Sequence, residues 1–253
     1  MDLQLNGRKA IVTGGTRGIG RAIVDTLVAE GAEVSFCARN AEEIRVMTAA
    51  LVTNGATAFG AVVDVADGAA LKAWVAQAAH RMGGIDIVVA NVSALSISSD
   101  DASWKQCFDV DMMGTVRLVD AAMPHLEQSK NASVVTISSV SGREVDFASG
   151  PYGAFKAAII HYTQGLAFHL AGKGIRANSV SPGNTYFPGG VWEKIEQGNP
   201  ALFKQSMELN PTGRMATPQE IANAVVFLSS PVASFITGTN LVVDGALTRG
   251  VQF

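Results

Sequence analysis

The sequence predicts a single α/β domain, residues 1–253, built on a doubly wound parallel sheet. Two observations carry this prediction. Short apolar segments alternate with segments of helical periodicity along the whole chain, without a break that would mark a second domain. Apolar residues also make up 48% of the sequence, which supplies the buried strands and tightly packed helices of such a fold.

The N-terminal half contains four expected strands and the helices between them. K-A-I-V-T is a short apolar run, and Ile19, Ile23 and Leu27 follow it at helical spacing. Gly31 and Gly55 stand where two helices should end. Strands are therefore expected at Lys9–Thr13, Glu33–Ala38, Ala58–Val63 and Ile85–Ala90, and helices at Gly18–Glu30, Ala41–Asn54 and Asp67–Met82.

The C-terminal half continues the alternation. Thr217 suits an N-cap and Pro218 the first turn of a helix. Helices are expected at Trp104–His125, Pro151–Ala171 and Pro218–Leu228, and strands at Ser133–Ile137, Arg176–Ser181 and Asn240–Val243. Gly183–Met215 is the one long segment with weak regularity. It is rich in Gly, Pro and aromatic residues, so we expect a substrate lid at about 184–215.

Composition and charge argue against several classes of function. The net charge is −3 and no basic run occurs, so no nucleic-acid partner is expected. The N-terminus has no apolar signal core and no apolar run reaches membrane-spanning length, so no membrane partner is expected. Cys37, Cys107 and the four histidines show neither disulfide nor metal-ligand spacing. We therefore expect a cytoplasmic protein without a metal site.

A glycine-rich turn, T-G-G-T-R-G-I-G, follows the first strand and opens a helix. Gly14, Gly18 and Gly20 permit a tight turn and a close approach of the backbone to a pyrophosphate, and the helix N-terminus offers free N–H groups. A plain strand-to-helix turn is the alternative interpretation. The strand–turn–helix context favours a dinucleotide site.

The end of the second strand selects between the two nicotinamide nucleotides. An acidic residue there would bind a ribose 2′-hydroxyl and repel a 2′-phosphate, but the sequence has Ala38-Arg39-Asn40. Arg17 lies in the nearby glycine-rich turn, and two guanidinium groups favour a phosphate. We therefore predict NADP(H) as the cofactor, with NAD(H) less favoured.

Ser139, Tyr152 and Lys156 form a candidate proton-transfer set. Tyr152 and Lys156 are four residues apart, so on a helix they share a face. An ordinary phenol has a pKa of about 10, and a neighbouring ammonium favours its ionised form. Ser139 follows the fifth strand and can donate to a substrate oxygen as this gains negative charge. An ordinary helix pair is the alternative, which the upstream serine and glycine-rich turn disfavour.

These motifs together resemble the short-chain dehydrogenase/reductase family, and most of all its 3-oxoacyl-carrier-protein reductase type. The resemblance covers nearly the whole chain and includes D-V at 64–65, S-P-G at 181–183 and V-D-G at 243–245. It implies a Rossmann-type sheet, nicotinamide hydride chemistry and a homotetramer. The cofactor-binding residues expected from the motifs are Gly14, Thr16, Arg17, Gly18, Ile19, Gly20, Arg39, Asn40, Asp64, Val65, Asn91, Tyr152, Lys156, Pro182, Gly183 and Thr185.

Three positions depart from the family pattern. Ser93 and Ala94 place side chains where the family normally has glycine to leave room, and Phe187 stands where it has a threonine near the carboxamide. Asp111 replaces the asparagine that completes the catalytic set. Asp111 is either a tolerated substitution, because the family role is mainly a backbone one, or a charge that pairs with Lys156 and shifts the pH–rate profile.

The expected activity is an NADP(H)-dependent oxidoreductase that moves a hydride between nicotinamide and a ketone or secondary alcohol, with Tyr152 as acid/base. The catalytic residues would be Ser139, Tyr152, Lys156 and Asp111. A non-catalytic NADP(H)-binding regulator is one alternative. The other is a halohydrin-dehalogenase-like lyase, but such relatives lose the glycine-rich turn and the lysine that this chain keeps. The substrate is a small molecule of unspecified identity.

Overall fold

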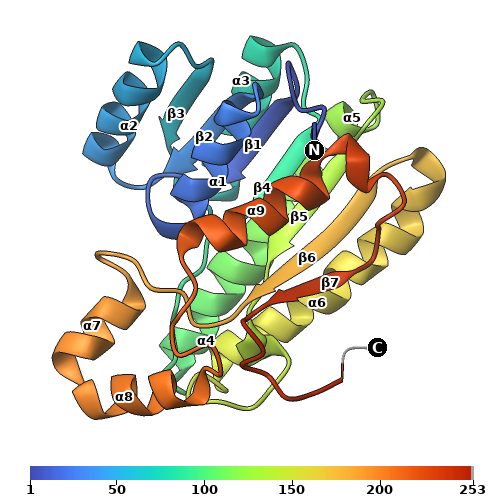
Figure 1. The fold of residues 1–253 in the computed structure, drawn as a ribbon. Coiled ribbons are helices and arrows are strands. Elements are labelled where there is room, and N and C mark those ends of the chain that lie inside the picture. Colours follow the sequence, from blue (N-terminus) through green and yellow to red (C-terminus); the bar gives the residue numbers. More distant parts are fainter. Residues whose placement is uncertain (252–253) are drawn as a thin grey trace.

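The computed structural model describes residues 1–251 of the 253-residue chain. These residues form one seven-stranded parallel sheet in the order β3-β2-β1-β4-β5-β6-β7 (Figure 1). The chain order reverses between β1 and β4, the point outside which ligands of such sheets bind. The strands are β1 (Lys9–Thr13), β2 (Glu33–Ala38), β3 (Ala58–Val62), β4 (Ile87–Ala90), β5 (Ser133–Ile137), β6 (Arg176–Pro182) and β7 (Asn240–Val243).

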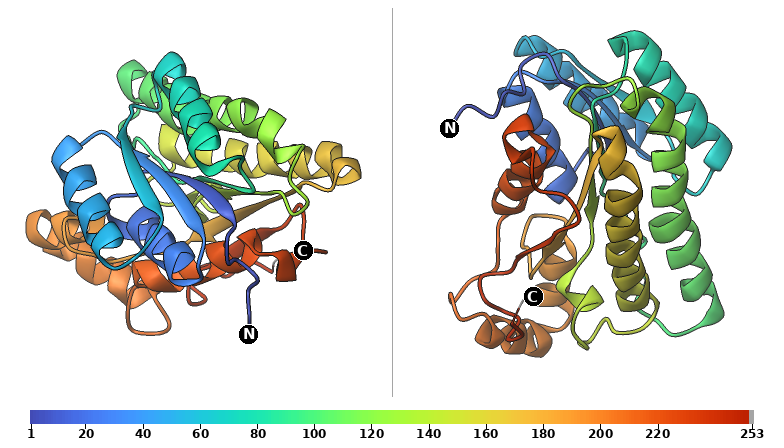
Figure 2. Two further views of the ribbon diagram at one scale, coloured as in Figure 1. Left: turned by 90° about the horizontal axis from the view of Figure 1, so that it is seen from above. Right: turned by 90° about the vertical axis from the view of Figure 1, so that its right-hand side faces the viewer.

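Two layers of helices cover the sheet (Figure 2). One layer contains α1 (Gly18–Ala29), α2 (Ala41–Thr53) and α9 (Pro218–Ser229), and the other contains α3 (Gly68–Met82), α5 (Gly114–Leu126) and α6 (Pro151–Leu170). Successive residues of a strand face opposite layers. In β4, Ile87 and Val89 join the first core, whereas Val88 and Ala90 join the second. Burial on both faces explains why uninterrupted apolar runs marked the strands, and the predicted α/β fold class is confirmed.

The long helix predicted at Trp104–His125 is three consecutive segments. It begins earlier, at α4 (Asp101–Cys107), because the Asp100 carboxylate caps the helix by accepting a 2.8 Å hydrogen bond from the Ser103 N–H. A π-helical segment, Phe108–Met113, then separates α4 from α5. Such segments widen one turn and are frequent at functional sites. Strand β4 is also shorter than predicted and begins at Ile87.

The segment of weak regularity, 184–215, contains two short helices, α7 (Val191–Gly198) and α8 (Pro200–Leu209). They project below the carboxyl ends of the strands in Figure 1, apart from the two layers. Asn199 separates them, and its side chain accepts a hydrogen bond from the Leu202 N–H at the start of α8. No helix within residues 1–251 has both the length and the apolar character needed to cross a membrane.

Candidate active site

The glycine-rich turn lies between β1 and α1 and is held in place by Asn91, the residue that follows β4. The Asn91 amide donates to the carbonyls of Thr13 and Gly14 over 3.1 and 3.2 Å, and its N–H donates to the Thr13 hydroxyl. A Cβ atom on Gly20 would overlap the Gly14 carbonyl, so only glycine permits this approach of helix to turn. Asn91 therefore positions the turn from the neighbouring strand.

The turn fits the diphosphate of a dinucleotide. The described helical bonds of α1 begin with the Arg21 N–H donating to Arg17, which leaves the N–H groups of Gly18 to Gly20 at the helix start. These N–H groups and the positive end of the helix dipole suit an anion. The geometry thus agrees with the expected site.

Beside Asn40, one of the residues predicted at the end of β2 to select the nucleotide, lies a carboxylate that the sequence analysis missed, that of Glu43. Arg17, Arg39 and Asn40 are all exposed. Thr16 donates its hydroxyl to a Glu43 carboxylate oxygen over 2.7 Å, and the Asn40 amide donates to the other oxygen over 3.4 Å. The Asn40 side chain also caps α2 by accepting from the Glu43 N–H. Because Asn40 caps α2, the Glu43 side chain in the first turn of this helix lies against the glycine-rich turn. In the sequence, only the N-cap residue Asn40 indicates this position of Glu43.

Neither Arg17 nor Arg39 forms an ion pair with a carboxylate of residues 1–251. Arginine in an unpaired, exposed position can offer its full fork to an anion. The two guanidinium groups thus remain available for an anion.

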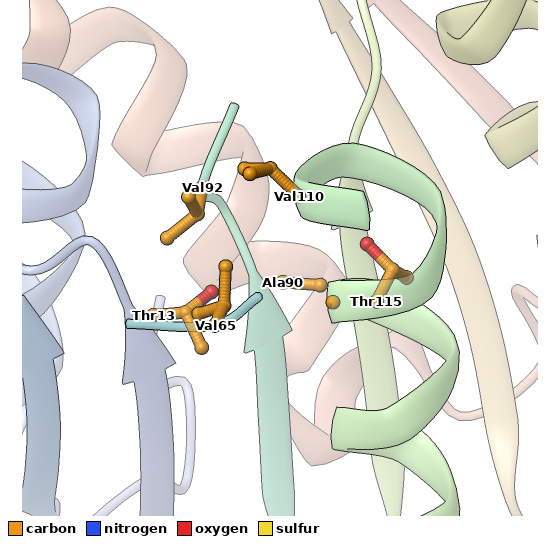
Figure 3. A pocket seen from close by; sticks show the side chains of 7 residues that line it. Thr13, Val65, Ala90, Val92, Val110 and Thr115 are labelled. Carbon is orange, nitrogen blue, oxygen red and sulfur yellow. The ribbon is translucent and has the colours of Figure 1, made fainter. Parts of the chain in front are cut away.

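Asp64 and Val65 follow β3 and lie on the same edge of the sheet. The Asp64 carboxylate accepts from the Ala66 N–H over 3.0 Å and fixes this turn. Val65 is buried and lines a narrow hollow between the end of β4 and α5 (Figure 3). The other residues that line the hollow are Thr13, Ala90, Val92, Val110, Gly114 and Thr115.

Tyr152 and Lys156 lie on one face of α6, as their spacing predicts. The Lys156 ammonium is 5.6 Å from the centroid of the Tyr152 ring and donates to the Ile137 carbonyl over 3.0 Å. Only 2% of Lys156 is exposed. Ile137 ends β5, so the ammonium joins the helix to the strand that leads into Ser139.

Ser139 is brought to α6 by a tight turn at Val140–Gly142. Its hydroxyl accepts from the Ser141 N–H over 3.1 Å, which orients the oxygen. A Cβ on Gly142 would lie 2.7 Å from the Lys156 carbonyl carbon, and a Cβ on Gly153 would lie 2.8 Å from the Ser141 carbonyl oxygen. These two glycines, which the sequence analysis did not single out, allow the turn to pack directly against α6.

Asp111 lies behind Lys156 on the π-helical segment and is 1% exposed. Its Oδ1 is 3.2 Å from Lys156 Nζ, but Oδ1 has no hydrogen bond of acceptable geometry, so the contact is an ion pair. Oδ2 accepts from the Ala94 N–H over 2.9 Å. The Asp111 carbonyl accepts from the Thr115 hydroxyl over 2.7 Å. The pairing of Asp111 with Lys156, one of two sequence-based interpretations, is therefore present in the structure.

Pro182, Gly183 and Thr185 continue from β6 along the same edge. Gly183 donates its N–H to Val243 of β7 over 3.0 Å. The Thr185 hydroxyl donates to the Gly183 carbonyl over 3.0 Å, and Thr185 is buried. Its hydroxyl thus holds the backbone of this turn.

Aromatic side chains of the lid gather beside these residues. Trp192 of α7 contacts Phe147 edge-on at a centroid distance of 5.7 Å and contacts Phe203 of α8 at 6.5 Å. Tyr186 packs on Phe203 at 6.2 Å. Trp192 and Phe203 belong to the segment that the sequence marks as rich in aromatic residues, whereas Phe147 comes from the loop after Ser139 and was missed because nothing in its local sequence marks that contact.

Phe187 rests on the glycine-rich turn. A Cβ on Gly18 would lie 2.5 to 2.9 Å from three atoms of the Phe187 ring, so the ring is in van der Waals contact with this glycine. The ring thus covers the start of α1. This contact joins the lid to the candidate diphosphate site.

The two cysteines take no part in this arrangement. Both are free and buried. Burial raises the pKa of the Cys37 thiol to about 12 and also raises the pKa of Cys107. Within residues 1–251 no group of three or more His, Cys, Asp or Glu side chains could hold a metal ion.

Comparison with known proteins extends these observations. Residues 14–248 match the family model described as Enoyl-(Acyl carrier protein) reductase. The chain is 42% identical to isoepoxydon dehydrogenase patN of Penicillium expansum, over 98% of each chain. It is 33% identical to 2,3-dihydro-2,3-dihydroxybenzoate dehydrogenase of Bacillus subtilis, again over 98% of each.

A solved structure shares the whole fold. It is a short-chain dehydrogenase from Burkholderia cenocepacia in complex with NADP, with a TM-score of 0.89 and 30% identity over 96% of this chain and 99% of that one. The motifs, the sheet order and these relatives agree. The chain belongs to the short-chain dehydrogenase/reductase family and is an enzyme of that family.

Proposed function

We propose that this protein is an NADP(H)-dependent oxidoreductase that transfers a hydride between nicotinamide and a ketone or secondary alcohol, with Tyr152 as acid/base. The observation that carries the proposal is the buried Lys156 ammonium 5.6 Å from the Tyr152 ring, on the helix against which the Ser139 turn packs. Bound nicotinamide would supply or accept the hydride at this edge.

Each residue of the set has a distinct role in this proposal. Tyr152 donates a proton to the substrate oxygen in reduction and removes it in oxidation. Ser139 donates a hydrogen bond to that oxygen as it gains negative charge. Lys156 favours the phenolate by Coulomb attraction. Of its three N–H groups one donates to Ile137, and another would hold the nicotinamide ribose.

We propose NADP(H) rather than NAD(H) because two exposed arginines, Arg17 in the glycine-rich turn and Arg39 after β2, have no carboxylate partner within residues 1–251 and could bind a 2′-phosphate. The complex of the Burkholderia relative with NADP supports this choice. Replacing Arg39→Asp should raise the KM for NADPH about tenfold to a hundredfold, the worth of a lost charged hydrogen bond. Arg45→Asp on the exposed face of α2 is the matched control. An unchanged KM for NADPH in Arg39→Asp would contradict the proposal that the protein prefers NADP(H).

For the substrate we propose a small cyclic ketone or secondary alcohol. The aromatic side chains of Phe147, Trp192 and Phe203 pack together in an apolar cluster that joins the lid to the loop after Ser139, and such a surface suits a compact ring. A relative named 2,3-dihydro-2,3-dihydroxybenzoate dehydrogenase acts, by its name, on a six-membered ring that carries hydroxyl groups.

An activity screen tests the proposal. The protein is offered cyclic ketones, β-ketoacyl thioesters and steroids with NADPH and NADH, and cyclic and sugar alcohols with the oxidised nucleotides. We expect turnover of cyclic ketones with NADPH. Fluorescence quenching by NADPH without turnover of any class would indicate a regulator, and activity without any nucleotide would indicate a lyase.

We further propose a cytoplasmic homotetramer. The free state of Cys37 and Cys107 supports a reducing compartment. Trp104 of α4 and Phe108 of the π-helical segment are exposed and pack against Phe155 of α6. The three side chains form an apolar strip that suits a subunit contact. Light scattering should give four times the 26.3 kDa chain mass, and a monomer mass would contradict this assembly.

A further inference from the structure

Two opposite charges are buried behind Tyr152. Asp111 and Lys156 are 1% and 2% exposed, and their Oδ1 and Nζ atoms are 3.2 Å apart. An ammonium that stands alone would act on the neighbouring phenol with its full positive charge. A carboxylate in contact with it offsets much of that charge at the phenol.

No other carboxylate of residues 1–251 lies within ion-pair distance of Lys156. The strand side supplies the neutral Ile137 carbonyl. The Tyr152 ring lies near the Lys156 ammonium on the same helix. Cys107 of α4 is close enough to Asp111 and Lys156 for both charges to act on its pKa. The pKa of Cys107 is raised by burial and then by Asp111, with Lys156 acting in the opposite sense. Asp111 is therefore the group that decides the net charge behind Tyr152.

The second carboxylate oxygen of Asp111 has a different task. Oδ2 accepts from the Ala94 N–H, next to Leu95, whose φ of 52° lies in the left-handed region. An asparagine could accept this same hydrogen bond through its amide oxygen. The change Asp111→Asn thus removes the charge while it preserves the contact with the 93–95 loop.

We propose that Asp111 is a positioning residue whose charge raises the pH at which Tyr152 changes between proton donor and proton acceptor. Loss of the phenolic proton creates a negative charge, which Lys156 stabilises and Asp111 opposes. With the carboxylate present, the phenol stays protonated to higher pH, so Tyr152 serves as proton donor over a wider pH range and becomes a proton acceptor only at higher pH. This inference rests on the proposed function, in which Tyr152 is the acid/base.

The test compares pH profiles of kcat/KM in both directions for the wild type, Asp111→Asn and Asp109→Asn. Asp109 is the matched control, because it lies on the same π-helical segment but pairs with the exposed Lys105 over 2.7 Å. We expect the midpoint of the Asp111→Asn profile to move to lower pH by about half a unit to one unit. The Asp109→Asn profile should coincide with that of the wild type.

Several outcomes would overturn the inference. Superimposable Asp111→Asn and wild-type profiles, or an equal shift in Asp109→Asn, would show that the Asp111 charge does not act on the proton transfer. If Asp111→Asn does not fold, Asp111→Ser replaces it, and failure of both to fold would make the pair structural. If Asp111→Asn and Asp111→Ser both bound NADPH but did not turn over, the Asp111 carboxylate would be essential for catalysis and would not merely shift its pH dependence. A wild type without nucleotide-dependent turnover would instead contradict the proposed function.

Discussion

At the scale of single residues, the unexpected feature of the cofactor side is Glu43. Its carboxylate accepts from Thr16 and Asn40, two residues expected to contact the nucleotide, and it follows the exposed Arg39 by four residues in the chain. A carboxylate close to a 2′-phosphate repels it, whereas a ribose hydroxyl is indifferent to that charge or can donate to it. Glu43 should therefore reduce the preference for NADP(H) that the arginines create.

The variant Glu43→Gln should raise the ratio of kcat/KM for NADPH over NADH about three- to tenfold, because it removes the charge and retains an acceptor for Thr16. The matched control is Glu42→Gln, since Glu42 is the preceding residue and pairs with Arg45 on the exposed face. Steady-state kinetics with both nucleotides measure the ratio. A ratio that stays constant or falls in Glu43→Gln would contradict this role.

At the scale of elements, the site depends on the packing of the Val140–Gly142 turn against α6. Gly153 and Gly165 lie on the same helix but in different surroundings. A Cβ on Gly153 would lie 2.8 Å from the Ser141 carbonyl oxygen, whereas a Cβ on Gly165 would meet nothing within 4 Å. Alanine at position 165 therefore changes only the helix propensity, whereas alanine at position 153 also disturbs the packing of the turn against α6.

We expect Gly153→Ala to lower the free energy of unfolding by about 1–3 kcal/mol and to lower kcat, because the turn that carries Ser139 must move. Gly165→Ala should instead raise the free energy of unfolding by about 0.5–1 kcal/mol and leave kcat unchanged. Urea unfolding and steady-state kinetics measure both effects. If the two variants behaved alike, the contact between turn and helix would not position Ser139.

The lid is a second element whose contacts lead to a prediction. The Phe187 ring rests on Gly18, where a bound diphosphate would need the helix N-terminus. Phe187→Thr should therefore lower the Kd for NADPH about three- to tenfold, since the ring no longer has to move. Phe203→Ala on α8 is the control, and fluorescence titration measures both. Unchanged or weaker NADPH binding in Phe187→Thr would exclude this competition.

At the scale of the whole molecule, the sheet could be predicted from the sequence because burial on both faces leaves an apolar run at each strand. Local patterns also placed Ser139, Tyr152 and Lys156. They did not reveal the π-helical break at Phe108–Met113, since an inserted residue hardly changes the apolar periodicity. Glu43 and Phe147 approach the site only through tertiary contacts, which a sequence pattern does not contain.

The proposed mechanism requires that Tyr152 moves the proton that accompanies hydride transfer, and single-turnover oxidation of NADPH by a cyclic ketone measures this step in isolation. The wild type and Tyr152→Phe are compared at equal saturation with nucleotide. The proposed mechanism predicts that Tyr152→Phe binds NADPH like the wild type and transfers the hydride about a hundredfold to ten-thousandfold more slowly. A Tyr152→Phe enzyme with the wild-type rate would contradict the account.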